Sequence, residues 1–302
     1  MIESRMATTH TSPSLIGRVA VVTVSYGSED VLGPFLASIP NGTALSPLVI
    51  VADNKATGVS GRVAELTVEA GAEYLPLPMN RGYGHAINEA VKSLRPEVDW
   101  VVISNPDVTV NPGSIDLLLA TADADWTIAA VGPRILTSDG EVYPSARTIP
   151  SLRSGIGHAI FANLWPSNPW SRTYRKETDA CLSQRDAGWL SGAFLVVRRS
   201  VFEALGGFDE SYFMYFEDVD LGYRIGKLGL RNVYQPAAAV VHTGAHSTST
   251  TDESARMIRA HHESAQKFLS KKYSGPFLLP VRIALAVGLG IRSRLEAGRR
   301  RR

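Results

Sequence analysis

Short apolar runs rich in β-branched residues alternate with helical patterns between Val19 and Ala130, and this alternation is the feature that constrains the fold most. Each run is nearly continuous in apolar residues, as expected for a strand covered on both faces. Repeated strand–helix–strand units predict an α/β fold, with a doubly wound, mostly parallel sheet and helices on both faces. The predicted strands are Val19–Val24, Leu48–Ala52, Trp100–Ser104 and Ile128–Val131, and the predicted helices are Glu29–Ser38, Val59–Ala70, Gly84–Ser93 and Pro112–Ala122.

The pattern changes after the fourth predicted strand. The segment Tyr143–Arg185 is rich in Pro, Ser, Arg and Trp and reads as a long loop. Regular patterns return with a strand at Gly192–Val197, a helix at Glu217–Leu228 and a strand-like run at Ala237–Val241. A further helix, predicted at Asp252–Ser270, extends the fold at its C-terminal end.

Several classes of protein are excluded by what the chain lacks. The first strand continues into Ser25-Tyr26-Gly27-Ser28, with neither the glycine pattern of dinucleotide-binding enzymes nor a P-loop. The single cysteine, Cys181, cannot form an internal disulfide, and no Cys/His cluster has zinc spacing. The net charge of +2 combines a basic end of +6 from residue 276 onward with a body of −4. An acidic body with a basic tail argues against nucleic acid as a partner and favours a membrane surface.

In doubly wound sheets, ligands bind beyond the carboxyl ends of the strands. Those positions hold Tyr26, the Asp53-Asn54 pair and Asn105-Pro106-Asp107. Asp107 follows a buried strand and stands next to a proline, so its carboxylate is a candidate ligand for Mg²⁺ or Mn²⁺; the alternative is an Asx turn. His242 follows a later strand-like run and is a second candidate ligand, or else a core residue.

Two further segments carry chemistry. The stretch 208–220 places five acids among five aromatic residues, where Glu217 or Asp218 could act as a general base or merely cap a helix. The segment Asn80-Arg81-Gly82-Tyr83-Gly84 opens a predicted helix, and its glycines would let a phosphate or ribose approach the backbone; a plain turn is the alternative.

Taken in order, these motifs resemble glycosyltransferase family 2, a family of inverting enzymes with the GT-A fold. The resemblance covers about Val19 to Ser247 and rests on the motifs above together with Gly206-Gly207-Phe208-Asp209-Glu210 and Glu217-Asp218-Val219-Asp220. Additional segments resemble the rhamnosyltransferase branch that acts on polyprenyl-diphospho-N-acetylglucosamine. They are Tyr143–Arg147, Trp165–Trp170, Gly188–Gly192 and the helix with His261-His262.

The resemblance implies roles for individual residues. The nucleotide sugar would be bound by Tyr26, Asp53, Asn80, Arg81, Gly82 and Asn105. The divalent metal would be held by Asp107 and His242, and the base would be Asp218, with Glu217 as second choice. The acceptor would be contacted by Trp189, Ser191 and Gly192. The chain departs from the D-x-D motif, since Asn105 stands where the family has its first aspartate. An asparagine contributes an oxygen but no charge, so the metal would depend more on the diphosphate.

The implied donor is dTDP-β-L-rhamnose and the implied acceptor is the 3-hydroxyl of N-acetylglucosamine on a polyprenyl diphosphate. One alternative is a family 2 enzyme with another donor or another lipid or glycan acceptor. A second alternative is a non-catalytic binding module, which would not need both an aspartate at a strand end and a base-like aspartate among aromatic residues.

We expect a disordered segment at 1–17, a catalytic domain at 18–250 with donor (18–132) and acceptor (133–250) halves, and C-terminal helices with a basic tail at 251–302. The apolar run Phe277–Ile291 is too short to span a bilayer. We therefore expect a cytoplasmic enzyme, peripheral on the inner face of the membrane, either monomeric or a homodimer.

Overall fold

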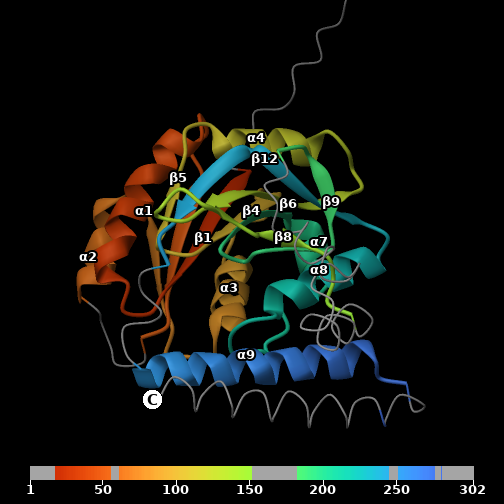
Figure 1. The fold of residues 1–302 in the computed structure, drawn as a ribbon. Helices are drawn as coiled ribbons and strands as arrows, with labels where there is room; N and C mark the ends of the chain where they lie inside the picture. The colour runs from red at the N-terminus through yellow and green to blue at the C-terminus, as the bar shows by residue number, and fades with distance from the viewer. Residues whose placement is uncertain (1–17, 56–60, 152–181, 245–250, 276–279, 281–302) are drawn as a thin grey trace, which may run out of the picture.

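The computed structural model describes residues 18–55, 61–151, 182–244, 251–275 and 280. A ten-stranded mixed sheet forms its centre, flanked by helices (Figure 1). The strand order is β3 (Glu73–Pro76), β2 (Leu48–Asp53), β1 (Val19–Ser25), β4 (Trp100–Ser104), β11 (Phe194–Arg198), β6 (Ile128–Leu136), β12 (Arg231–His242) and β5 (Val108–Val110). Two short strands pair outside this path, β7 (Val142–Tyr143) with β6 and β9 (Arg185–Ala187) with β12.

The first half of the sheet is parallel, as predicted. β1 pairs in parallel with β2 and β4, and β2 with β3. β11 enters between β4 and β6 and runs antiparallel to both, whereas β12 is parallel to β6. The α/β class and the doubly wound, mostly parallel centre are confirmed, with the antiparallel insertion of β11 added.

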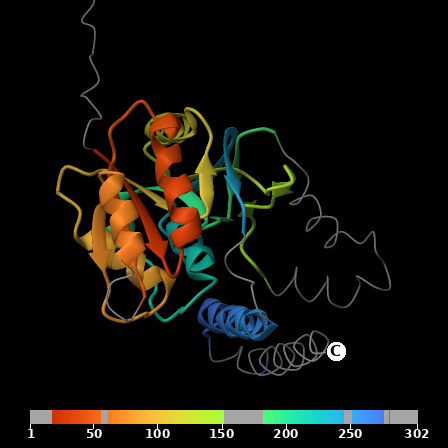
Figure 2. The ribbon, with the colours of Figure 1, turned by 90° about the vertical axis from the view of Figure 1, so that its left-hand side faces the viewer.

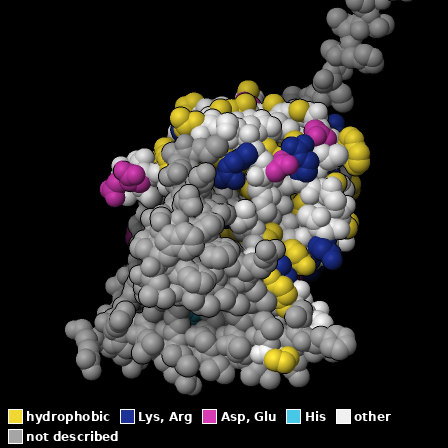
Figure 3. Space-filling model, turned by 45° about the vertical axis from the view of Figure 1, so that its right-hand side comes forward, with side chains coloured by type: hydrophobic (Ala, Val, Ile, Leu, Met, Phe, Trp, Pro, Cys, Tyr) yellow, Lys and Arg dark blue, Asp and Glu magenta, His cyan; other side chains and the backbone are white. Residues whose placement is uncertain are grey.

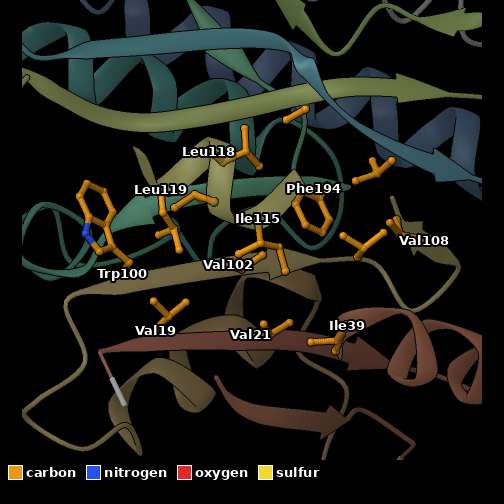
Figure 4. Close-up of a cluster of buried hydrophobic side chains, with 14 of the residues drawn as sticks. Val19, Val21, Ile39, Trp100, Val102, Val108, Ile115, Leu118, Leu119 and Phe194 are labelled. Atoms are coloured by element: carbon orange, nitrogen blue, oxygen red, sulfur yellow. The ribbon is translucent and has the colours of Figure 1, made fainter. Parts of the chain in front are cut away.

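Helices cover both faces of the sheet because successive strand residues alternate between the faces. Val19 and Val21 pack with α1 (Glu29–Gly42) and α4 (Ser114–Asp123), as Figure 4 shows in part. Ala20 and Val22 pack on the other face. The helices of that face are α3 (Tyr83–Lys92), α7 (Arg199–Ala204) and α8 (Glu217–Lys227), and α2 (Gly61–Glu69) lies beside α1.

Most predicted boundaries lie within a few residues of the observed ones, but β6 continues to Leu136 instead of Val131 and β12 begins at Arg231 instead of Ala237. Helix α1 is a further and informative exception. Helix α1 was predicted to end at Ser38, before Pro40, but it continues to Gly42. A Cβ atom on Gly42 would lie 2.4 Å from Val110 Cγ1, so the missing side chain lets the last turn of α1 pack directly on β5. Tertiary packing therefore extends the helix past its proline.

The long loop predicted at Tyr143–Arg185 is only partly visible. Its ends carry β7 and β8 (Ala146–Arg147), and β8 pairs antiparallel with β10 (Trp189–Leu190) in a separate two-stranded sheet. Residues 152–181, including Cys181 and the tryptophan–proline segment, lie outside the described residues. The same holds for residues 1–17 and for nearly all of the chain after residue 275.

Helix α9 (Thr251–Lys272) lies below α3 and α8 in Figure 1, and Figure 2 views it nearly along its axis. Its Phe268 is buried against Tyr212 and Val219. Among the described residues no helix combines the length and apolarity that crossing a membrane requires. On the face shown in Figure 3, acidic and basic side chains lie next to one another. Ion pairs of this kind include those of Arg231 with Asp125 and Asp186, at 2.8 and 2.7 Å.

Candidate active site

The ends of β1 and β2 form the first part of the site. Asp53 is paired in register with Ser25 and is buried. Its carboxylate accepts hydrogen bonds from the Tyr74 hydroxyl at 2.9 Å and the Lys55 backbone N–H at 3.1 Å. Burial, followed by the bond to Asp53, raises the pKa of Tyr74 to about 12. Tyr26 follows β1 with an exposed ring, so a buried carboxylate and an open aromatic face lie at adjacent strand ends.

The turn before α3 lies close to this pair. The Asn80 side chain accepts a 3.0 Å bond from the Gly82 N–H, and the Asn54 amide donates to the Gly82 carbonyl at 3.2 Å. Gly82 has a φ of +105°, and a Cβ there would lie 2.3 Å from the Phe213 carbonyl oxygen. Only glycine fits this position, so the turn is built for close backbone approach. Arg81 is exposed and 3.5 Å from Glu210, directed toward that acid.

Asp107 and His242, 135 positions apart in the chain, meet at the end of β4. Pairing of β5 with β12 sets His242 opposite Val108, and His242 Nε2 lies 3.0 Å from Asp107 Oδ1. The Asn105 amide nitrogen is 3.2 Å from the same histidine nitrogen. The side chain of Asp107 is 9% exposed and that of His242 is 21% exposed. The Asp107 carboxylate is the kind of oxygen ligand that Mg²⁺ and Mn²⁺ prefer, and the imidazole beside it offers a nitrogen to the same place.

The Asx-turn alternative for Asp107 finds no support. Among the described residues, no backbone N–H donates to its carboxylate; only its main-chain carbonyl is used, by Thr243. The carboxylate therefore faces His242 and remains available to a cation.

The start of α8 positions the acidic pair. Tyr215 and Phe216 have φ values of 67° and 69°, a left-handed conformation that is costly for bulky residues. This pair of left-handed residues, called the elbow below, turns the chain so that Glu217 and Asp218 occupy the first turn of the helix. The Gly192 and Val219 N–H groups donate to Asp218 Oδ2 and Oδ1 at 2.9 and 2.8 Å.

Helix α9 holds the elbow in place. The Ser264 hydroxyl donates to the Met214 carbonyl at 2.9 Å, and the Phe216 ring lies 5.3 Å from His261 and 5.8 Å from Phe268. Lys267 and Lys271 bind Ser211 and Asp209 in the same segment. The cost of two left-handed bulky residues is therefore offset by packing against α9.

Electrostatics distinguish the two acids. Burial raises the pKa of Glu217, and the neighbouring Asp218 raises it further. Burial also raises the pKa of Asp218, opposed by the N–H donors of Gly192 and Val219 and by the charge of Arg147. Glu217 Oε2 has no hydrogen-bond partner among the described residues. When the pair carries one proton, these donors favour its placement on Glu217, leaving Asp218 as the carboxylate that can accept a proton.

Gly192 and Ala193 connect the metal-binding candidates to the acidic pair. Gly192 donates its N–H to Asp218 and accepts a 2.9 Å bond from the Tyr83 hydroxyl, while the Asn105 N–H donates to the Ala193 carbonyl at 2.9 Å. Burial raises the pKa of Tyr83, and the charges of Glu217, Asp218 and Asp107 raise it further. Asp107 and Asp218 thus lie around one tyrosine, in one site.

Not every predicted residue points into this site. The Trp189 indole donates to the Thr148 carbonyl at 3.2 Å and packs near the elbow. Trp189 also lies directly against Gly222, where an added Cβ would be 2.6 Å from the Trp189 Cβ. Ser191 is buried and its hydroxyl accepts from the Ala193 N–H. These two residues support the backbone on either side of Gly192.

Sequence reasoning missed Tyr83, Tyr143 and Arg147 as single residues, although the first lies inside Asn80–Gly84 and the others inside the Tyr143–Arg147 segment. It also gave no sign of a second group of ligand atoms, formed by His85, Glu89 and Glu210 within 4.8 Å. Glu210 already binds His85 at 2.9 Å and Asn88 at 3.1 Å, and Glu89 binds Lys92 at 2.6 Å. These side chains are therefore hydrogen-bonded to protein partners, and the bonds of Glu210 to His85 and Asn88 connect the segment before α8 to α3.

Known proteins show the same combination of fold and motifs. Residues 17–261 match the model of the family described as glycosyltransferase like family 2. The chain is 44% identical over 297 residues to the N-acetylglucosaminyl-diphospho-decaprenol L-rhamnosyltransferase of Mycobacterium tuberculosis, covering 93% of this chain and 95% of that protein. It is 28% identical over 262 residues to the rhamnosyltransferase WbbL of Escherichia coli, covering 84% and 93%.

Among solved structures, a mannosyltransferase of Pyrobaculum calidifontis, in complex with GDP-Man and Mn²⁺, superposes with a TM-score of 0.56 at 18% identity, covering 94% of this chain and 72% of that one. This likeness concerns the fold, which is GT-A. Family match, identity and fold agree, and the chain belongs to glycosyltransferase family 2.

Proposed function

We propose that this glycosyltransferase moves L-rhamnose from dTDP-β-L-rhamnose to the 3-hydroxyl of N-acetylglucosamine on a polyprenyl diphosphate, with inversion at the anomeric carbon. The observation that carries the reaction type is the arrangement of Asp107 with His242 and of Asp218 around Gly192-Ala193 and Tyr83. The choice of substrates rests on the 44% identity to the rhamnosyltransferase of Mycobacterium tuberculosis.

The donor nucleotide is assigned to the ends of β1 and β2. Asp53 and Tyr26 would contact the base, and the backbone of Asn80 and Gly82 would line the nucleoside, where glycine permits close approach. Asn105 would reach the ribose or the diphosphate with its amide. Arg81 can join these contacts only by leaving Glu210.

Asp107 and His242 are the residues that would hold a divalent metal, with Asn105 beside them. When bound there, Mg²⁺ or Mn²⁺ supplies Lewis-acid stabilisation of the charge that develops on the departing nucleoside diphosphate. The structure favours this assignment because Asp107 and His242 face each other directly.

Asp218 is proposed as the general base. Each of its oxygens accepts one backbone N–H bond, which leaves lone pairs free to take the proton of the acceptor hydroxyl. As that oxygen forms a bond to the anomeric carbon, the bond to the diphosphate breaks on the opposite side, so a β-linked donor gives an α-linked product. Glu217, protonated beside it, would keep a second negative charge out of the site.

The acceptor sugar is assigned to the space beside Asp218 at Gly192, while Trp189 and Ser191 would act by holding the backbone of this segment in place. We assign the donor half to residues 18–132 and the acceptor half to 133–250.

The segment after residue 251 would bring the enzyme to the inner face of the cytoplasmic membrane, where its lipid acceptor lies. A variant truncated after Pro276 should then sediment less with anionic vesicles than the full chain does, and equal sedimentation would remove this part of the proposal.

One experiment tests the function as a whole. Purified protein is incubated with dTDP-rhamnose, a short-chain N-acetylglucosaminyl-diphospho lipid and Mg²⁺ or Mn²⁺, and the lipid product is weighed by mass spectrometry. We expect a gain of one deoxyhexose. The second candidate, a related transferase with another donor, predicts no gain here; a thermal-shift series of dTDP-, UDP- and GDP-sugars would then reveal the preferred nucleotide, because bound ligand raises stability.

A further inference from the structure

Arg147 is the residue whose placement the proposed roles leave unexplained. It ends β8, which pairs with β10 so that Arg147 lies directly opposite Trp189. Residues opposite one another in an antiparallel pair project from the same face. Since Trp189 packs against Gly222 of α8, Arg147 projects toward α8 as well. The two strands are called the β8–β10 ribbon below.

The ribbon is held rigidly. The Gly188 N–H donates to the Arg147 carbonyl and the Ser191 N–H to the Ser145 carbonyl, both at 2.8 Å. Outside it, the Ser145 hydroxyl donates to the Pro133 carbonyl at 3.1 Å, which ties the ribbon to β6. A side chain carried by such a segment is placed in advance of any ligand, which lowers the entropic cost of binding.

The guanidinium of Arg147 is only partly engaged. Its Nε donates to the Pro144 carbonyl at 3.0 Å. Within the part of the chain that the structure describes, neither terminal nitrogen has a hydrogen bond or an ion pair. Its pairing with Trp189, which packs on α8, brings its charge within electrostatic range of Asp218 and of the half-exposed Tyr143. A guanidinium with both terminal nitrogens available is suited to grip a phosphate at two points.

Two diphosphates could supply that anion, one from the donor and one from the acceptor. The donor's diphosphate is already assigned to Asp107 and His242, across Gly192-Ala193 from Asp218. Arg147 belongs to the β8–β10 ribbon, which reaches Asp218 from the α8 side. In the acceptor, the reacting hydroxyl and the diphosphate are carried by C3 and C1 of one sugar ring. Because the donor's diphosphate has its own ligands at Asp107 and His242, the anion that Arg147 would meet on the α8 side of the site is the acceptor's.

From this geometry we propose that Arg147 is a specificity-determining residue that binds the diphosphate of the lipid-linked acceptor, an inference that rests on the proposed function. It would make the enzyme prefer acceptors with an anionic linkage over neutral glycosides of the same sugar. Arg147 would also orient the ring so that its 3-hydroxyl reaches Asp218.

The test compares acceptors that differ in charge. Wild type and Arg147→Lys are assayed by equilibrium binding and by transfer, with a short-chain N-acetylglucosaminyl-diphospho lipid and with the neutral octyl glycoside of N-acetylglucosamine. Lysine keeps the positive charge near Asp218 but loses the two-point grip. Arg185→Lys is the matched control, because Arg185 flanks the same ribbon but is already engaged with the Ala146 carbonyl at 2.9 Å and with the Tyr234 ring.

We expect Arg147→Lys to weaken binding of the diphospho lipid, and to raise its KM, by roughly ten- to a hundredfold, the effect of losing a hydrogen bond to a charged group. Binding of the neutral glycoside and of dTDP should stay within about twofold, and Arg185→Lys should change neither acceptor. If Arg147→Lys weakened binding and transfer equally for the charged and the neutral acceptor, the inference would be overturned, and Arg147 would instead act by influencing Asp218. Weaker dTDP binding would assign Arg147 to the donor instead.

Failure of the proposed function would look different. A wild type that binds the diphospho lipid more tightly than Arg147→Lys but transfers no rhamnose would disprove the donor or the reaction while supporting Arg147. A wild type that transfers rhamnose while Arg147→Lys binds the lipid equally well would disprove the Arg147 inference alone.

Discussion

The two acids of the site are positioned in different ways. Asp107 follows a buried strand and meets His242 through the pairing of β5 with β12, so the sheet itself places it. Asp218 follows two residues in left-handed conformation, and its position depends on the packing of the elbow against α9. Burial raises the pKa of the second acid. Strand pairing therefore places the proposed metal ligand, and the packing of α9 against the elbow places the proposed base.

The largest expected effect separates the acids by reaction step. Asp218→Asn should lower kcat by about 10²–10⁴-fold, because the amide cannot accept the proton of the acceptor. Binding of dTDP with Mn²⁺, measured by calorimetry, should remain that of the wild type. Near wild-type turnover in this variant would assign the base elsewhere, and Glu217→Gln tests the neighbouring acid under the same conditions.

Asp107→Asn should show the complementary pattern. Loss of a charged ligand should weaken Mn²⁺-dependent binding of dTDP by roughly ten- to a hundredfold or more, with metal-independent binding much less affected. Titrating dTDP into the variant with Mn²⁺ and then with a chelator measures both. If Mn²⁺ still strengthened dTDP binding as in wild type, the metal would be held by other residues.

Removing the support of the elbow should affect stability and activity together. Phe268→Ala deletes a buried ring that packs on Phe216 and Tyr223, and should cost about 3–5 kcal/mol of unfolding free energy. If the fold survives, kcat should fall while dTDP binding with Mn²⁺ is retained, because the deleted ring packs on the elbow before Asp218 and not on Asp107 or His242. Chemical denaturation gives the stability. A variant with lower dTDP affinity and unchanged kcat would contradict the comparison.

The raised pKa of Asp218 predicts the acid side of the activity profile. The base must be ionised, so kcat/KM should fall as pH drops through a value above the ordinary pKa of aspartate, 3.8. Glu217 is already protonated where Asp218 titrates, so Glu217→Gln should leave this limb in place. A limb that moved to lower pH in this variant would show that Glu217 is charged when Asp218 loses its proton.

The same burial has a consequence for stability. The pKa of Glu217 is higher in the folded than in the unfolded protein, so its contribution to stability is present at low pH and is lost as pH rises through the folded-state value. Glu217→Gln should lack this loss, which denaturation at several pH values can detect. A wild type and variant with parallel stability profiles would contradict the raised pKa.

A smaller effect is expected from the Ser264 hydroxyl, which donates to Met214 just before the elbow. Ser264→Ala should cost about 0.5–1.5 kcal/mol of stability, the usual range for one hydrogen bond. Turnover should decline slightly and dTDP binding should not change. A loss of dTDP binding would mean that α9 also supports the donor side.

The same contrast explains what the sequence could predict. Trp100–Ser104 is a continuous apolar run and is found as predicted, and from its end the position of Asp107 follows. His242 was a second candidate ligand from its place after a strand-like run, and the family resemblance strengthened that assignment. The pairing of β5 with β12, which brings His242 to Asp107, has no local sequence signal. The left-handed conformation of Tyr215 and Phe216 also has no signal, since bulky residues normally avoid it. No role was predicted for Arg147, because its position near Asp218 depends on the pairing of β8 with β10 and on the packing of that ribbon on α8.

The most direct test is a crystal structure of the enzyme with Mn²⁺, dTDP and a short-chain N-acetylglucosaminyl-diphospho lipid. The account predicts that the metal bridges Asp107, His242 and the diphosphate, and that the acceptor 3-hydroxyl lies within about 2.6–3.2 Å of an Asp218 oxygen. A complex with the metal held away from Asp107, or with the acceptor hydroxyl out of reach of Asp218, would contradict it.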